Sequence, residues 1–399
     1  MSDVKTHDAG RISPALIVLL SLLTALDAMA IDMYLPGMPD MAVAFNTDAG
    51  RMQLTLAIFL AGLAIGQALY GPLLDRYGRR TPVLAGMALF SAASFGAAAA
   101  TSVEMLMVMR FLQALGASAG LVSPRAIVSD RYSDGEAAKI FTILMQVMMI
   151  APVVAPVVGG YVLGLGDWRL IFMMLGVLGT AGFFWCAASL PDSLPLAKRT
   201  PLHPRSILRA YAAVFKNRRY MLYTIASGVA LGSLFNYIAT SSFIFTHFYA
   251  LSPQSFSYIF ALNALVSIVA GFISVWLLNL GMSARAVTIL GLGLHAAMGL
   301  LLAVVLVMHG VTAVGFTVML AAAMGSLGLI YGNIMALVMQ NAGSSAGVAA
   351  AVMGALQYLI SSLIGYLISL FPQGPLSLAL SILLCGLLAI ALCTQVRDA

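Results

Sequence analysis

The chain has 399 residues, of which 61% are hydrophobic and 9% charged, with a mean hydropathy of +1.00. About a quarter of the residues in a soluble domain are charged, so this composition excludes a soluble protein and predicts a polytopic membrane protein. The net charge of +6 does not indicate a nucleic-acid partner, because membrane topology accounts for where the basic residues fall. The cysteines Cys186, Cys385 and Cys393 lie in apolar segments without ligand spacing, so no metal, cofactor or disulfide framework is expected.

The first apolar segment, residues 14–36, is long enough to cross a bilayer and contains Asp27 and Asp32. The polar head before it, residues 1–13, has no small-residue cleavage site after it, so the segment is predicted to be a retained span rather than a signal peptide. Carboxylates at membrane depth are costly and usually face a protein interior, an aqueous cavity or a partner charge. Both aspartates are therefore candidate functional residues.

Eleven further apolar segments complete a predicted set of twelve membrane-spanning helices. They fall at about residues 49–73, 82–101, 103–128, 137–163, 169–190, 220–247, 254–280, 285–308, 311–338, 346–371 and 375–395. One long polar connection separates an N-terminal six-helix half, residues 1–190, from a C-terminal six-helix half, residues 220–399. The predicted fold is an all-α polytopic membrane protein with two six-helix halves joined by a basic linker, residues 191–219.

The basic residues predict the orientation of these helices. Sixteen lysines and arginines fall on the side of the N-terminus, whereas only Arg51 and Arg169 fall on the other side. Cytoplasmic loops are enriched in lysine and arginine, so both termini are predicted to be cytoplasmic. The linker carries seven of the sixteen: Lys198, Arg199, Arg205, Arg209, Lys216, Arg218 and Arg219. It is interpreted as a tether near anionic lipid rather than a nucleic-acid-binding or partner-binding segment.

A charged turn joins the second and third segments, with the sequence Gly71-Pro72-Leu73-Leu74-Asp75-Arg76-Tyr77-Gly78-Arg79-Arg80. Glycines suit positions of close helix approach or positive φ. The turn resembles the signature loop of the major facilitator superfamily of membrane transporters, which forms a cytoplasmic gate latch; a solvated turn with incidental charges is the alternative. The latch residues that the resemblance implies are Gly71, Asp75, Arg76, Gly78, Arg79 and Asp130. Asp75, Arg79 and Asp130 are expected to hold the outward-open state closed on the inside and to separate in each cycle.

The fourth segment contains Arg110, about seven residues or roughly 10 Å below the outer boundary, with Gln113 on nearly the same helix face. A buried arginine is expected to need a carboxylate partner. This pattern resembles the arginine motif of proton-coupled members of the superfamily. The resemblance implies a proton-coupling set of Asp27, Asp32 and Arg110, and a purely structural ion pair is the alternative.

The fifth segment carries Pro152, Pro156, Gly159 and Gly160 on one helix face. Such a small, bendable surface allows another helix to pack closely. The segment resembles the glycine-proline-x-x-glycine-glycine motif of antiporters in the superfamily, with Ala155 in place of the first glycine. Ordinary helix packing is the alternative.

The C-terminal half is poor in charge, since from residue 220 onward only Arg285, Arg397 and Asp398 are charged and none lies in mid-membrane. Coupling chemistry is therefore expected in the N-terminal half, with polar and aromatic contacts from the other. The predicted substrate-binding residues are Asp27, Asp32, Tyr34, Gln113, Asn236, Tyr237, Tyr258, Asn263, Tyr331, Gln357 and Tyr358. For each polar residue of the C-terminal half, a hydrogen bond between helices is the alternative.

Two motifs, Ile31-Asp32-Met33-Tyr34-Leu35-Pro36 and Ser123-Pro124-Arg125-Ala126, resemble the Bcr/CflA group of bacterial drug-resistance transporters. The resemblance implies a monomer in the bacterial inner membrane that exports small amphipathic compounds, such as bicyclomycin-like or phenicol-like drugs, in exchange for protons. A proton-coupled exporter or importer of a small metabolite would carry the same motifs. An integral membrane enzyme or a receptor is a remote alternative, because no spacing of His, Ser or acids resembles a catalytic group.

Asp27 and Asp32 are five residues apart, so a regular helix places them about 140° apart and about 7.5 Å along its axis. They cannot face one point unless the helix is deformed, for which Pro36 and Gly37 provide a place. Measured from the outer membrane boundary, the depth of Arg110 lies between the depths of the two acids. We expect Asp32 to be the partner of Arg110 and Asp27 to be the proton carrier.

Overall fold

The computed structural model describes residues 14–132, 134–190, 192–194, 199, 212, 214–308, 310–342 and 346–396. Within these ranges the chain is helical and contains no β-strand. Twelve helices are long and apolar enough to cross a membrane, so the prediction of an all-α protein with twelve spans is confirmed. Much of the predicted linker lies outside the described residues.

The helices follow one another in antiparallel order along the chain. Their bounds are α1 (Pro14–Asp32), η1 (Leu35–Gly37), α2 (Met38–Ala44), α3 (Ala49–Tyr77), α4 (Arg80–Ala98), α5 (Val103–Arg131), α6 (Asp134–Leu165), α7 (Arg169–Ser189), α9 (Arg218–Phe243), η3 (Ile244–Phe248), α10 (Pro253–Asn279), α11 (Ala284–Met308), α12 (Ala313–Gln340), α13 (Ala346–Ser369) and α14 (Pro375–Thr394). We call the side of the molecule that carries α2 the α2 end, and the opposite side the Arg79 end.

The first span is interrupted near its end by Pro36. Proline has no backbone N–H and its ring clashes with the carbonyl four residues earlier, which accounts for the end of α1 at Asp32. The chain makes a short turn, in which the N–H of Gly37 donates to the carbonyl of Tyr34 at 3.0 Å, and then continues as α2. The break at Pro36 and Gly37 follows both acids, so Asp27 and Asp32 lie on one regular helix. The Tyr34 side chain, next to the break, is fully buried.

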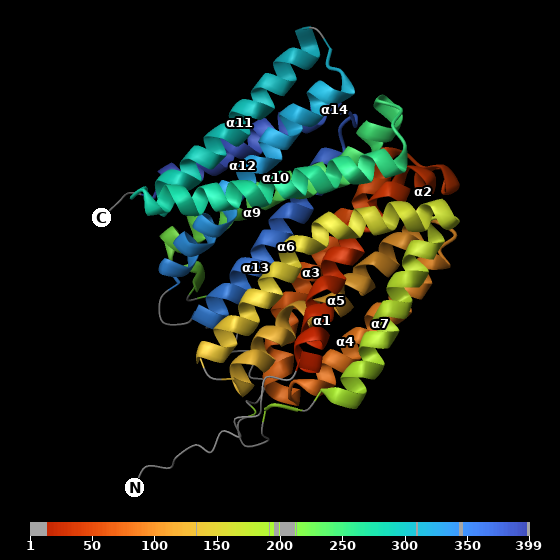
Figure 1. Cartoon of the computed structure of the whole chain (residues 1–399), viewed down its shortest axis with the longest axis vertical. Coiled ribbons are helices and arrows are strands. Elements are labelled where there is room, and N and C mark those ends of the chain that lie inside the picture. The colour runs from red at the N-terminus through yellow and green to blue at the C-terminus, as the bar shows by residue number, and fades with distance from the viewer. Residues whose placement is uncertain are drawn as a thin grey trace.

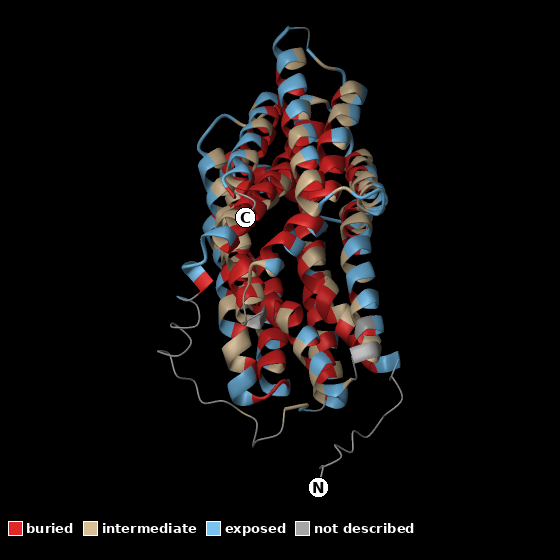
Figure 2. Ribbon diagram, turned by 90° about the vertical axis from the view of Figure 1, so that its left-hand side faces the viewer, coloured by how far each residue is buried: buried red, intermediate tan, exposed pale blue. Residues whose placement is uncertain are grey.

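The helices form two groups, α1–α7 and α9–α14 (Figure 1). In the first group α5 packs against α1, α3 and α4, and in the second α12 packs against α9, α10 and α11. Two helix pairs make most of the contacts between the groups, α3 with α13 and α6 with α10; α9 also contacts α2 and α3, and η1 contacts α9 and α10. Buried residues follow the inner faces of the helices and exposed ones their outer faces (Figure 2). Apolar side chains such as Phe272 and Trp276 are exposed on the outside, as expected for a surface that lipid covers.

The two groups are in direct contact at the α2 end. Hydrogen bonds that join them include Ser362 Oγ to the carbonyl of Ala57, at 2.8 Å, and the hydroxyls of Tyr161 and Tyr258, 2.9 Å apart. Figure 1 shows the groups side by side near α2 and farther apart at their opposite ends. The structure is therefore closed at the α2 end.

Candidate functional site

Arg110 is fully buried, and it bonds to the end of another helix. Its Nη1 donates to the carbonyl of Ala30 at 2.8 Å and to Oε1 of Gln113 at 2.7 Å. Ala30 lies in the last turn of α1, where backbone carbonyls lack partners within the helix. A cation at a helix C-terminus is also favoured by the helix dipole. Arg110 therefore caps α1 where the span is broken.

Aromatic rings complete the surroundings of Arg110. The guanidinium carbon lies 4.2 Å from the ring centroid of Tyr34 and 4.2 Å from that of Phe59. At these distances the faces of the rings attract the cation. The hydroxyl of Tyr34 is 3.3 Å from Oγ1 of Thr55, which ties the ring to α3. Tyr34 and Gln113, both predicted to bind substrate, lie fully buried inside the first group around Arg110.

The prediction that Asp32 pairs with Arg110 is wrong. The ion pairs within 4.0 Å among the described residues involve Arg51, Arg79, Arg169 and Arg199, but not Arg110. The helix end and the aromatic rings supply acceptors and ring faces for the cation without burying a second charge, which would have to be desolvated. Nε and Nη2 of Arg110 are buried and have no hydrogen-bond partner among the described residues.

Asp27 and Asp32 are 4% and 3% exposed, and each has a buried Oδ1 with no partner among the described residues. An unsatisfied buried polar atom is costly and calls for a functional explanation. Asp32 lies in electrostatic range of Tyr237 in α9, and Asp27 in range of Tyr358 in α13. The two acids therefore lie near tyrosines of the second group at two different levels along α1.

Tyr237 belongs to a small polar cluster in the second group. Nδ2 of Asn263 donates to the Tyr237 hydroxyl at 2.9 Å, which leaves the hydroxyl proton available for donation. The ring of Phe260 is stacked on that of Tyr237 at 5.4 Å. Oδ1 of Asn263 is buried without a partner among the described residues. Tyr237 and Asn263 therefore have unused hydrogen-bonding capacity, in the hydroxyl proton of the tyrosine and in Oδ1 of the asparagine.

Other predicted residues of the second half bond to neighbouring helices, which was the alternative to ligand contact. Asn236 donates to Ser381 at 2.7 Å and Gln357 to Ser227 at 2.9 Å. The Tyr331 hydroxyl contacts the carbonyl of Ala230, and the Tyr258 hydroxyl contacts the Tyr161 hydroxyl. The ring of Tyr358 packs against the ring of Phe235. Tyr258 is exposed, so it lies at the edge of the contact between the groups.

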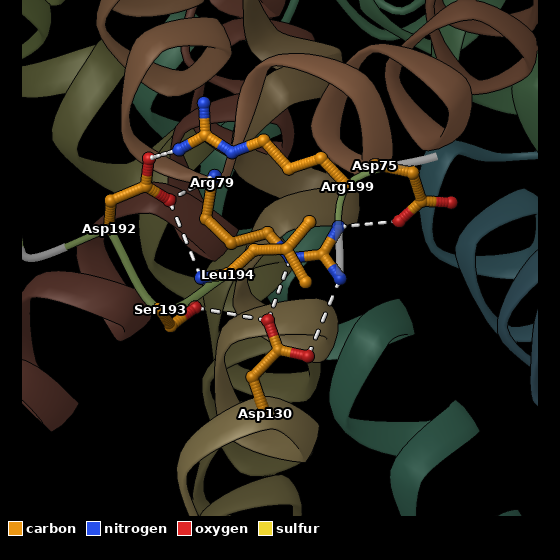
Figure 3. A network of polar contacts seen from close by, with 7 residues as sticks. All are labelled: Asp75, Arg79, Asp130, Asp192, Ser193, Leu194 and Arg199. Atoms are coloured by element: carbon orange, nitrogen blue, oxygen red, sulfur yellow. Dashed lines mark hydrogen bonds and ion pairs between the residues drawn. The ribbon is translucent and has the colours of Figure 1, made fainter. Parts of the chain in front are cut away.

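The charged turn forms the predicted ion pairs at the Arg79 end (Figure 3). Nη1 of Arg79 donates to Asp75 and Nε to Asp130, both at 2.7 Å. Gly78 has a φ of 83°, a conformation that glycine adopts without strain. Gly71 makes no close approach to another helix, because a Cβ there would meet nothing within 4 Å. Arg76 is exposed.

The network also includes residues after α7 that the sequence reasoning assigned to a simple tether. Oδ1 of Asp192 accepts from the backbone N–H of Arg79 at 2.8 Å, and Asp192 also pairs with Arg199. Ser193 Oγ donates to Asp130 at 3.0 Å. A Cβ on Gly78 would lie 2.2 Å from Oδ2 of Asp192, so glycine is needed for this approach as well. One feature of the sequence could have indicated this role: Asp192 is the only acidic residue in the basic segment 191–219.

Gly159 and Gly160 place α6 between helices of both groups. A Cβ on Gly159 would lie 1.9 Å from the carbonyl oxygen of Met33, next to the break in α1. A Cβ on Gly160 would lie 2.7 Å from Oγ of Ser257 in α10. Both glycines therefore lie where a neighbouring helix comes too close for a side chain. Pro152 and Pro156 lie within α6, which continues through them.

Sequence comparison relates the chain to known transporters. The family model described as Major Facilitator Superfamily matches residues 20–366. An uncharacterized MFS-type transporter, YdgK, of Bacillus subtilis is 38% identical over 67% of each chain. A chloramphenicol resistance protein of Pseudomonas aeruginosa is 34% identical over 64% of this chain and 60% of its own. A bicyclomycin resistance protein homolog of Haemophilus influenzae is 28% identical over 65% of each. The matched regions thus span about two thirds or less of these relatives.

Solved structures of transporters share the fold. A D-xylose-proton symporter superimposes with a TM-score of 0.76 over 94% of this chain and 96% of its own, at 13% identity. A POT family transporter does so with a TM-score of 0.78 over 95% and 94%, at 12% identity. Together with the family match, these findings mark the chain as a transporter rather than an enzyme. The chain belongs to the major facilitator superfamily and, as its motifs predicted, resembles the Bcr/CflA group of drug-resistance transporters.

Proposed function

We propose that the protein exports small amphipathic drugs across the bacterial inner membrane in exchange for protons, as a monomer, by alternating access. The observation that carries this proposal is the pair of buried acids in α1. Each has an Oδ1 without a partner among the described residues, and each lies in electrostatic range of a tyrosine of the second group. Relatives named for resistance to chloramphenicol and bicyclomycin support a drug as the substrate.

The proposed coupling uses each acid in two protonation states. A buried carboxyl group is most easily kept neutral, whereas a bound drug that donates hydrogen bonds or exposes the site to water favours the ionised form. Drug binding from the cytoplasm then displaces the proton, and reprotonation from outside resets the carrier. Arg110 serves this cycle by holding the broken end of α1, so that Asp27 and Asp32 keep their positions.

The distribution of charge supports an inward-facing assignment for this structure. At the α2 end Arg51 pairs with Glu104, and Arg169 with Asp167 at 3.3 Å, so both basic residues there are neutralised. The other end carries the excess of lysine and arginine that marks cytoplasmic loops. A structure closed at the α2 end is then open toward the cytoplasm.

This assignment bears on the proposed latch. The described members of the network all precede residue 200 and belong to α3, α5, the turn between α3 and α4, and the segment after α7. Their ion pairs are formed here although the groups meet at the α2 end. In the proposed orientation, the network therefore ties the first group together in the inward-facing state too, and its role is not restricted to the outward-open state.

The test is efflux of chloramphenicol driven by a pH gradient in everted vesicles. At least one of the variants Asp27→Asn and Asp32→Asn is expected to lower gradient-driven efflux ten-fold or more, because an amide cannot carry a proton. Asp40→Asn is the control, since Asp40 is an exposed acid in α2 of the same span. If both test variants kept full efflux, the proposed coupling would be wrong. If efflux is lost as expected, measuring proton release from the purified protein with different drugs identifies which compounds are exchanged for protons.

A further inference from the structure

Arg125 is a charged residue of α5 that belongs to neither the Arg110 site nor the Arg79 network. Its side chain is exposed, although its neighbours Ser123 and Pro124 are buried. It takes part in none of the ion pairs found within 4.0 Å among the described residues. An arginine in a membrane-spanning helix without such a pair marks a functional position by default.

The packing of α1 on α5 gives the level of Arg125 relative to Asp27. The two helices are antiparallel, and Gly120 packs on the carbonyl of Leu23 while Arg110 bonds to that of Ala30. Asp27 lies between these two contacts. Arg125 is five residues beyond Gly120, about 7.5 Å farther along α5. Helical side chains lean toward the N-terminus of their helix, which for α5 is the α2 end, so the Arg125 side chain extends back toward the level of Asp27.

The second group reaches the same level through α13. A Cβ on Gly354 would lie 2.1 Å from Oε1 of Gln67, and the neighbouring Gly66 packs on Ser118 of α5. Tyr358 is one helical turn from Gly354 toward the α2 end, which brings it to the level of Asp27. Tyr358 lies in electrostatic range of both Asp27 and Arg125, and Asp27 in range of Arg125, in agreement with this placement.

We propose that Arg125 sets the charge selectivity of the substrate site, which it forms with Asp27 and Tyr358 between the two groups. This inference rests on the proposed drug export. The guanidinium offers five hydrogen-bond donors and no acceptor, so it suits neutral compounds that carry carbonyl or nitro oxygens. The pair of side chains has a net charge of +1 when Asp27 is protonated and of zero when it is ionised. Neither state attracts a lipophilic cation.

The test is equilibrium binding to the purified full-length protein in detergent, with chloramphenicol as the neutral probe and tetraphenylphosphonium as the cation. Arg125→Gln is expected to weaken chloramphenicol binding at least five-fold and to strengthen tetraphenylphosphonium binding at least ten-fold, because Asp27 then acts alone. Arg125→Lys keeps the charge and is expected to keep excluding the cation. Arg131→Gln, at the exposed end of the same helix, is the matched control and should bind both probes as the wild type does.

A second variant links the gain to Asp27. Adding Asp27→Asn to Arg125→Gln is expected to remove the gained affinity for the cation. If Arg125→Gln gives no gain in cation binding, or if Arg125→Lys gives the same gain, Arg125 does not set the charge selectivity. Because binding is measured without a pH gradient, this outcome is distinct from failure of the proposed antiport, which vesicle efflux measures.

Discussion

At the scale of single residues, the surroundings of Arg110 explain how a full charge is kept inside the bundle without a counter-ion. The cation meets the carbonyl of Ala30, the amide oxygen of Gln113 and the rings of Tyr34 and Phe59. Each partner carries only partial negative charge, so both acids of α1 remain free of an ion pair with it. In the proposed antiport, protons and substrate compete for Asp27 and Asp32 without having to displace this arginine.

Tyr34 offers a direct test of this arrangement. Tyr34→Leu removes a ring from the desolvated guanidinium and is expected to lower the stability of the protein by about 2 kcal/mol, with loss of transport. Tyr34→Phe keeps the ring and removes only the 3.3 Å contact with Thr55, so it should change stability by less than about 1 kcal/mol. Unfolding in detergent measures both. Equal losses from the two substitutions would show that the hydroxyl, rather than the ring, supports Arg110.

The depth and burial of Arg110 follow from its place in an apolar segment, but its partner could not be predicted. A backbone carbonyl becomes an acceptor only because α1 ends at Asp32, and sequence does not label which carbonyl a neighbouring helix will meet. Arg110 was therefore assigned to Asp32, one of the two acids that flank it in depth. The acids themselves were correctly placed in the buried interior, because a carboxylate in an apolar span has few other tolerable positions.

At the scale of elements, α6 contacts both the broken end of α1 and α10 of the other group through adjacent glycines. Gly159→Ala is expected to cost at least about 3 kcal/mol and to abolish transport, because the new methyl group meets the Met33 carbonyl, a backbone atom that cannot rotate away. Gly160→Ala meets the Ser257 hydroxyl, which is a side chain, so a smaller loss is expected. Folded yield and efflux report both effects.

Gly164→Ala is the control for these substitutions, because its Cβ would come no closer than 3.4 Å to Nε2 of Gln254. If Gly159→Ala behaved like Gly164→Ala, the end of α1 would be free to move away from α6. The twelve membrane-spanning helices could be predicted, because apolar stretches of this length are typical of helices that cross a bilayer. The partners of α6 could not, because a small-residue face predicts close packing without saying which helix fills it.

At the scale of the whole molecule, the sequence predicted two sets of six helices but not where they touch. Hydropathy carries no information on the angle between the groups, which depends on contacts such as that of Ala57 with Ser362. The contacts of Asp192 with the charged turn were also not predicted, because a long basic connection is typical of a solvated tether. Alternating access requires the contacts at the α2 end to open, so they must be individually weak, as single hydrogen bonds are.

This requirement can be tested by locking the α2 end with a disulfide. The Cβ position of Gly160 lies 3.4 Å from Cβ of Ser257, close to the separation of about 3.8 Å found in disulfides. Oxidation of the variant Gly160→Cys/Ser257→Cys is expected to abolish efflux, because the two groups can no longer part, and reduction should restore it. The native Cys186, Cys385 and Cys393 are buried, which limits competing oxidation. The efflux of each single-cysteine variant should be the same with and without the oxidant, and full efflux by the cross-linked protein would show that α6 and α10 stay together throughout the cycle.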